Sequence, residues 1–194
     1  MKEMTGFAMI LGITCVAATG LLAAMNMITA PTIKAQAQKD LETSLMEIMP
    51  GGARFKPVEK NGAVIYYKIY GSDDKLIGTA FKTNRKGYSS VIETIAGMDL
   101  EGKITAIKII NQNETPGLGT RVTEINNSIG ILDFFAGKRQ DTTIKPWFQA
   151  QFSGRTVPDL DGVQAITGAT ISSRAVIESV KTKAKEIEEL LRNG

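Results

Sequence analysis

The sequence predicts an α+β protein: an N-terminal transmembrane helix followed by a single domain with a mostly antiparallel sheet flanked by helices. Two observations predict this class. Residues 7–28 form an apolar run, and no Asp, Glu, Lys or Arg lies between residues 4 and 33. Farther along, strand-like runs are grouped in the middle of the chain, with helical patterns before and after them.

The apolar run is long enough to be a membrane anchor, since a helix of about 20 residues crosses the ~30 Å hydrocarbon core. It is longer than the core of a typical signal peptide, and it is apolar on every face, unlike a surface helix of a soluble protein. We therefore expect a retained anchor at residues 1–30, in preference to a cleaved signal or a buried soluble helix. The flanking lysines are too evenly divided to set its orientation.

A helical pattern continues or restarts at residues 32–49, where Leu41, Leu45 and Ile48 share one face. Pro31 suits the first turn of a helix better than a helix interior. A Pro-Gly-Gly sequence at residues 50–52 ends the pattern. We expect a helical connector at residues 31–60 and one folded domain at residues 61–194.

The domain begins with runs rich in β-branched and aromatic residues, separated by turn-forming residues. These runs predict strands at residues 63–70, 76–83, 91–98 and 103–110. A helix is expected at residues 122–135. A final helix is expected at residues 173–191, where apolar residues recur at helical spacing.

Composition excludes several classes of site. The chain has no histidine and one cysteine, Cys15, which lies in the apolar run. Zinc, iron–sulfur and haem sites need ligands that this chain lacks, so no metal site is expected. The net charge of +3 arises from interspersed lysines and acids, which argues against a nucleic-acid partner. Any redox chemistry would therefore depend on an organic cofactor.

One short motif points to a phosphate. A turn of small residues presents a threonine hydroxyl directly before the last predicted helix, where backbone N–H groups and the helix dipole favour an anion. An ordinary helix cap would also explain such a turn. The residues are Thr167, Gly168, Ala169 and Thr170.

A second motif begins 53 residues earlier, directly after the last predicted strand. Its proline and glycines would suit a simple turn, but a turn does not explain the pairing with the first motif. Its residues are Glu114, Thr115, Pro116, Gly117, Leu118 and Gly119.

Together the two motifs resemble those of the FMN-binding domains of Rnf and Na⁺-NQR redox complexes. The likeness covers roughly residues 80–175 and includes a Lys-Gly-Tyr-Ser stretch at residues 86–89 and the sequence at residues 102–108. The resemblance implies FMN held covalently, as a phosphoester on Thr170. It also implies that the second motif forms a loop against the flavin, with Leu118 over the ring and Tyr88 as an aromatic neighbour.

Several roles stay open. Ser172, Ser173 and Thr167 could hydrogen-bond phosphate oxygens, while both serines could equally cap the helix. Glu114 could orient the loop, contact the flavin, or be an exposed carboxylate. Trp147 is expected in the core rather than beside the flavin. Gln164 stands where the family often has an acidic residue, which leaves Asp161 as a nearby substitute.

By its length and single anchor, the chain most resembles the G subunits of Rnf complexes. That resemblance implies an electron-relay subunit of an ion-translocating ferredoxin:NAD⁺ oxidoreductase, coupled to Na⁺ or H⁺ movement and without independent catalysis. It implies other membrane and peripheral subunits as partners, and a flavin transferase for maturation. It further implies a single pass through the cell (inner) membrane, with the C-terminal domain extracytoplasmic.

Other functions remain open on the sequence. The chain could be the C subunit of a Na⁺-NQR-type complex or another membrane-tethered flavinylated carrier. It could be a structural or assembly subunit with an empty flavin site. A secreted ligand-binding domain would require removal of residues 1–30.

Overall fold

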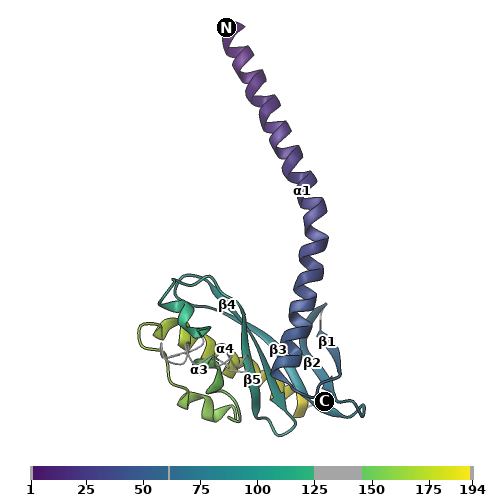
Figure 1. The fold of residues 1–194 in the computed structure, drawn as a ribbon, viewed down its shortest axis with the longest axis vertical. Coiled ribbons are helices and arrows are strands. Elements are labelled where there is room, and N and C mark those ends of the chain that lie inside the picture. The colour runs from purple at the N-terminus through teal and green to yellow at the C-terminus, as the bar shows by residue number, and fades with distance from the viewer. Residues whose placement is uncertain (1, 61, 125–145, 193–194) are drawn as a thin grey trace, which may run out of the picture. The chain divides into compact units, whose positions relative to one another are not determined.

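A computed structural model describes residues 2–60, 62–124 and 146–192. The chain forms two compact units, Met1–Thr43 and Ser44–Gly194. The predicted α+β class is confirmed, because a long N-terminal helix is followed by an antiparallel sheet with helices (Figure 1).

The first element, α1 (Lys2–Ile48), is one continuous helix with Pro31 in its interior. The sequence left open whether the helix continues or restarts here, and the structure shows that it continues through Pro31. Proline removes one backbone hydrogen bond, but helix propagation is cooperative on both sides of it in an element of 47 residues. The part Met9–Ile48 contains a segment long and apolar enough to cross a membrane, and that segment is not buried in protein.

Threonine hydroxyls in the apolar part of α1 are satisfied within the helix itself. Thr14 Oγ1 donates to the Leu11 carbonyl, Thr19 Oγ1 to the Cys15 carbonyl, and Thr29 Oγ1 to the Met25 carbonyl. Hydrocarbon offers no hydrogen-bond partner, so internal bonds of this kind suit a helix placed in a bilayer.

The sheet is an antiparallel meander in which each strand pairs with the next along the chain (Figure 1). Its last four strands confirm the four that the sequence predicts, with ends that differ by at most three residues. The strands are β1 (Arg54–Lys60), β2 (Ala63–Tyr70), β3 (Leu76–Lys86), β4 (Val91–Asp99) and β5 (Ile104–Asn111).

Strand β1 lies within the range expected to be a helical connector and was not predicted. Its sequence, RFKPVEK, has charged residues at four of seven positions and shows no alternation of buried and exposed side chains. It is an edge strand, where a proline such as Pro57 is tolerated. Pairing with β2 therefore creates this strand, and its own pattern does not reveal it.

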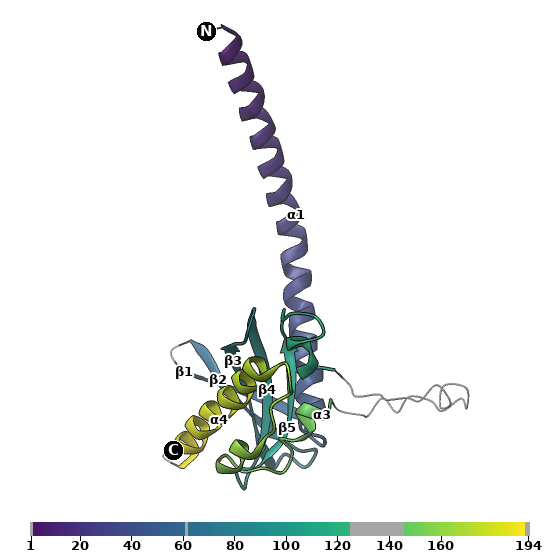
Figure 2. The same ribbon diagram turned by 90° about the vertical axis from the view of Figure 1, so that its left-hand side faces the viewer.

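One face of the sheet packs against α4 (Thr170–Arg192), which lies over β3 and β4 (Figure 2). The short elements α3 (Trp147–Ala150) and η2 (Pro158–Gly162) extend this layer. The core between them contains fully buried side chains from both layers. They include Phe81, Ile104, Phe148, Phe152, Leu160, Val180 and Ile187.

The last turn of α1 covers the opposite face of the sheet. Thr105 Oγ1 donates a hydrogen bond of 2.8 Å to the Ile48 carbonyl, and Lys108 Nζ lies 2.7 Å from Glu47 Oε2. Gly97 lacks the Cβ that would stand 3.3 Å from the Ile48 carbonyl oxygen. Leu45 and Ile48 are each 1% exposed, so this contact forms a second, smaller core.

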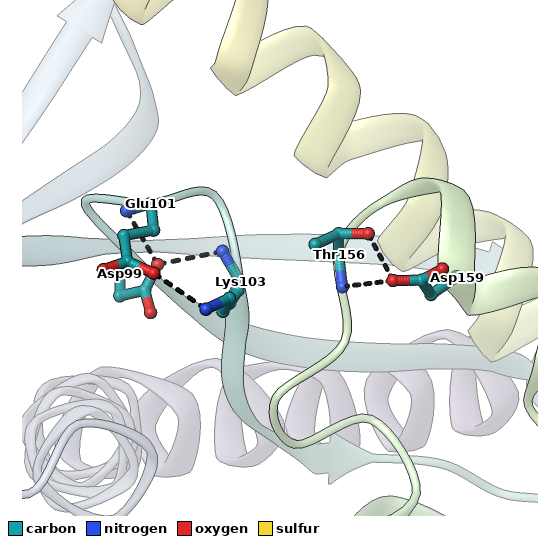
Figure 3. A network of polar contacts seen from close by, with 5 residues as sticks. All are labelled: Asp99, Glu101, Lys103, Thr156 and Asp159. Atoms are coloured by element: carbon teal, nitrogen blue, oxygen red, sulfur yellow. Dashed lines mark hydrogen bonds and ion pairs between the residues drawn. The ribbon is translucent and has the colours of Figure 1, made fainter.

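Backbone pairing holds the segment that leads to α4 against the start of β5, and each of the two segments has its own polar contacts (Figure 3). In the β4–β5 turn, Asp99 Oδ1 accepts hydrogen bonds from the backbone N–H groups of Glu101 and Lys103. Lys103 forms a β-bridge with Thr156, and the Thr156 hydroxyl donates to Asp159 Oδ2. This linkage orients the chain just before the first motif.

The final helix confirms its prediction but begins earlier, since Thr170 is its first residue instead of preceding it. Gly168, at φ +82°, makes the turn into the helix. The other predicted helix, residues 122–135, lies mostly outside the described residues. Val122 ends the short turn η1 (Gly119–Val122).

Replacing Ile48 by Ala should destabilise the C-terminal unit by about 2–5 kcal/mol, because a buried aliphatic side chain leaves a cavity. Urea unfolding of the full chain in detergent, followed by the fluorescence of the single tryptophan, Trp147, measures this. Met46→Ala is the matched control, since Met46 is 55% exposed in the same turn. Equal unfolding midpoints for the two variants would contradict the second core.

Candidate functional site

The two sequence motifs meet at a cavity of about 260 Å³. The 114–119 loop comes from the end of β5, and the 167–170 turn leads into α4. Small and apolar residues form most of the wall. The lining residues are Tyr88, Leu118, Gly119, Gly168, Ala169, Thr170, Ile171 and Ser172.

Thr170 stands at the edge of this cavity, exposed, as the first residue of a 23-residue helix. The first backbone N–H groups of a helix have no partner within the helix, and the helix dipole adds positive potential at that end. Gly168 keeps the approach open, because a Cβ added there would lie 3.7 Å from Leu118 Cδ2. The position is therefore suited to a phosphate attached to the Thr170 hydroxyl.

Glu114 lies one layer behind the cavity wall and joins three segments of the chain. Its Oε1 accepts hydrogen bonds from the backbone N–H groups of Ser89 and Ser90, at 3.0 and 2.8 Å, and from the Ser90 hydroxyl. Its Oε2 accepts from the Tyr88 N–H at 3.1 Å and from the Ser172 hydroxyl at 2.5 Å. The side chain is 4% exposed, so the interpretation of Glu114 as an exposed carboxylate is wrong.

Two glycines make room for this carboxylate. A Cβ on Gly119 would stand 2.5 Å from Glu114 Oε2, and a Cβ on Gly87 would stand 2.8 Å from Glu114 Oε1. Neither glycine has a positive φ, so close packing, and not backbone conformation, requires them. Gly119 of the second motif therefore lacks a side chain because Glu114, the first residue of the same motif, fills that space.

Burial raises the pKa of the Glu114 carboxyl, but the hydrogen bonds outweigh it. The Ser172 hydroxyl and the N–H groups of Ser90, Ser89 and Tyr88 hold its pKa below the ordinary value of 4.5. Glu114 is therefore an ionised anchor at neutral pH and is poorly suited to act as a base.

Neither serine after the first motif caps α4. Ser172 is inside the helix and donates its proton to Glu114, which leaves it no proton for a phosphate oxygen. Ser173 is fully buried, accepts a 3.1 Å hydrogen bond from the Ile166 N–H, and does not line the cavity. Both serines instead tie the start of α4 to its surroundings.

The remaining residues of the second motif shape the loop. Thr115 Oγ1 lies 3.0 Å from Ser89 Oγ, and the Leu118 N–H donates to the Thr115 carbonyl. Pro116 and Gly117 form an exposed turn in which Gly117 has φ +73°. Exposed apolar side chains then rim the cavity, namely Tyr88, Leu118 and Ile171. Ile171 was not predicted, although its place directly after the motif could have signalled it.

Thr167 does not line the first cavity. It lines a second, more polar one of about 310 Å³, with Arg121, Trp147 and Gln164 among its other residues. Arg121 Nη1 donates to the Thr167 carbonyl at 3.0 Å and so supports the 167–170 turn. Sequence reasoning missed Arg121, which no pattern singles out.

The prediction that Trp147 packs in the core is wrong, since its side chain is 45% exposed. The next residue takes that place: Phe148 is 1% exposed and packs edge-on against Phe152 at 5.5 Å. Asp161, considered as a substitute acid for Gln164, forms an ion pair with Lys181 at 2.6 Å. Within the described residues no group of three or more His, Cys, Asp or Glu side chains could hold a metal ion.

Substituting Glu114 by Gln should change the pH dependence of folding. The folded-state pKa of Glu114 lies below its unfolded value, so the carboxylate stabilises the fold above about pH 4.5. This contribution is lost as the pH falls through the folded pKa. The free energy of unfolding of the wild type and Glu114→Gln should therefore differ most near pH 7 and converge as the pH falls from 4.5 through the folded pKa, with Glu189→Gln on the exposed face of α4 as control. A pH-independent difference would contradict an ionised Glu114.

Two family models match this chain. Residues 87–185, about half of the chain, match the model of the FMN-binding domain, and residues 1–48 match that of the RnfG N-terminal region. A solved structure of NqrC from Shewanella oneidensis has a TM-score of 0.42 and 16% identity, covering 73% of this chain and 74% of that one.

Three relatives, each the G subunit of its complex, match nearly the whole chain. One relative is the G subunit of the Na⁺-translocating ferredoxin:NAD⁺ oxidoreductase complex of Acetobacterium woodii. It is 29% identical, with 97% of this chain and 94% of the relative covered. Another is the G subunit of the proton-translocating ferredoxin:NAD⁺ oxidoreductase complex of Clostridium ljungdahlii. It is 30% identical, with 91% of this chain and 88% of the relative covered. A third is the G subunit of the ion-translocating oxidoreductase complex of Vibrio atlanticus. It is 27% identical, with 93% of this chain and 88% of the relative covered. The chain belongs to the FMN-binding domain family and, with its RnfG-type N-terminal region, to the RnfG-type proteins within it.

Proposed function

We propose that this protein is a membrane-anchored electron carrier with FMN esterified to Thr170. The observation that carries the proposal is the exposed Thr170 hydroxyl at the first turn of α4, beside a cavity rimmed by Tyr88, Leu118 and Ile171. A phosphate would lie at the helix N-terminus, and apolar side chains would contact the flavin ring.

The residues present fit this group. Esterification would form a bond between Thr170 Oγ1 and the phosphorus of a flavin donor, break the bond from that phosphorus to the donor's leaving group, and release the Thr170 proton. A flavin transferase would catalyse this transfer. The Thr170 side chain is exposed, so a transferase can reach it. The cavity, at about 260 Å³, is below the ~300–1,000 Å³ of typical ligand pockets, so part of the flavin would project beyond the wall.

Bound FMN supplies the redox chemistry: it takes up two electrons with a proton and can pass the electrons on singly. The chain's own residues bind and orient it. Ser172 and the 88–90 turn are fixed by Glu114, which keeps the wall rigid. An open cavity suits electron exchange with a partner protein better than turnover of a small substrate.

The names of the relatives suggest which complex the protein belongs to. Two of them are named as G subunits of ferredoxin:NAD⁺ oxidoreductase complexes, one Na⁺-translocating and one proton-translocating. We therefore assign the protein to an Rnf-type complex, in which it relays electrons between neighbouring subunits while the complex moves Na⁺ or H⁺. The chain is thus part of a translocase and has no catalysis of its own.

The apolar segment of α1 serves as a single-pass membrane anchor, and the RnfG-type N-terminal region coincides with this helix. We assign the C-terminal unit to the extracytoplasmic side of the cell membrane. Covalent attachment has a clear advantage there, because a dissociated flavin would be lost from the cell.

Thr170→Ala should abolish flavin fluorescence of the protein band after denaturing electrophoresis, because the ester oxygen is absent. The wild type and Thr170→Ser, each expressed with a flavin transferase, should fluoresce. Thr167→Ala is the matched control, since Thr167 lies three residues earlier and outside the cavity wall. A wild-type band without fluorescence would instead favour a structural subunit with an empty site. A fluorescent Thr170→Ala band would show that FMN is attached to another residue.

The orientation is testable with single cysteines in a Cys15→Ser background, because the chain has no other cysteine. A cysteine at the exposed position Lys75 should react with a membrane-impermeant maleimide in intact spheroplasts. A cysteine at Lys2 should react only after lysis. The reverse pattern would place the C-terminal unit in the cytoplasm.

A further inference from the structure

We propose that Glu114 is a fixed negative charge that lowers the midpoint potential of a flavin bound in the cavity. This inference rests on the proposed function and assigns a property of the same site to a residue that does not itself line the cavity.

The carboxylate lies directly behind the wall. Ser172, a lining residue, donates to Glu114 Oε2 at 2.5 Å. Tyr88, a second lining residue, donates its N–H to the same oxygen at 3.1 Å. Gly119, a third, is so close that an added Cβ would stand 2.5 Å from that oxygen. Only one layer of protein therefore separates the charge from the cavity.

In the described part of the chain, no neighbouring cation cancels this charge. All the groups that donate to Glu114 in the described part of the chain are neutral, namely three backbone N–H groups and two hydroxyls. Hydrogen bonds from neutral donors stabilise a carboxylate while leaving its net charge in place. The side chain is also 4% exposed, so solvent ions screen it less than a surface charge.

This charge acts on electron uptake. Reduction by two electrons and one proton, drawn from the redox partners and solvent, leaves one more negative charge in the cavity. Two like charges repel, and the repulsion is stronger inside protein than in water. Glu114 therefore makes the reduced state less favourable and favours electron transfer onward to an acceptor.

The experiment is a spectroelectrochemical titration of the full-length flavinylated protein in detergent, at neutral pH with redox mediators. Glu114→Gln keeps the size of the side chain and removes its charge. Ser172→Ala is the matched control, because it breaks the shortest hydrogen bond to Glu114 but leaves the charge in place. At the potential where the wild type is half reduced, Glu114→Gln should be mostly reduced, and Ser172→Ala should be half reduced or less.

A second pair of variants leaves Glu114 and its hydrogen bonds intact. Leu118→Lys places a positive charge on the cavity wall at a half-exposed position, and Leu118→Gln is its neutral control. Leu118→Lys should have a higher midpoint potential than Leu118→Gln, because both variants lose the same apolar contact and differ by one charge. This pair tests, without altering Glu114, the requirement of the proposal that a charge beside the cavity changes the potential.

Equal shifts for Glu114→Gln and Ser172→Ala would show a structural effect and overturn the proposal. An unchanged midpoint in Glu114→Gln, or equal midpoints in Leu118→Lys and Leu118→Gln, would overturn it as well, while leaving the flavin-carrier function intact. A wild-type protein without flavin would overturn both, so the two failures are distinguishable.

Discussion

The candidate site depends on one interaction, the hydrogen bonding of the buried Glu114 carboxylate. An ionised carboxylate is costly to bury unless its oxygens accept several hydrogen bonds. The backbone after β3, the hydroxyl of Ser90 and the hydroxyl of Ser172 in α4 together meet that requirement. Satisfying one charge thus fixes the relative positions of the 88–90 turn, the 114–119 loop and the first turn of α4.

The sheet provides the rigid support that this arrangement needs. Its two faces are covered differently, by α4 and its neighbours on one side and by the last turn of α1 on the other. The 114–119 motif follows the end of β5 and the 167–170 motif leads into α4, so that both loops are held by a buried scaffold. The β-bridge between Lys103 and Thr156 adds a second attachment for the segment that precedes Thr170, and local contacts of Asp99 and Asp159 support its two sides (Figure 3).

The cavity combines two environments. At one side, the start of α4 offers N–H groups and positive potential to an anion. At the other, Tyr88, Leu118 and Ile171 offer apolar surface that water would otherwise cover. An amphiphilic group with a phosphate at one end and a flat ring at the other matches both. The same openness that exposes a bound ring to partner proteins also makes a covalent link useful, since the cavity alone encloses little of the ligand.

Local sequence determined the parts of the protein that depend on short-range patterns. The apolar run, four of the five strands and the amphipathic α4 all follow from periodicity, and both motifs stand out because they are contiguous. Tertiary structure alone decided the rest. Strand β1 exists through pairing with β2, and Pro31 lies within α1 because the helix continues on both sides of it. Ser172 meets Glu114 across 58 residues, and Phe148 takes the core position expected for Trp147. Such outcomes depend on which distant groups compete for the same hydrogen bonds and the same buried volume, and no local pattern in the chain encodes that competition.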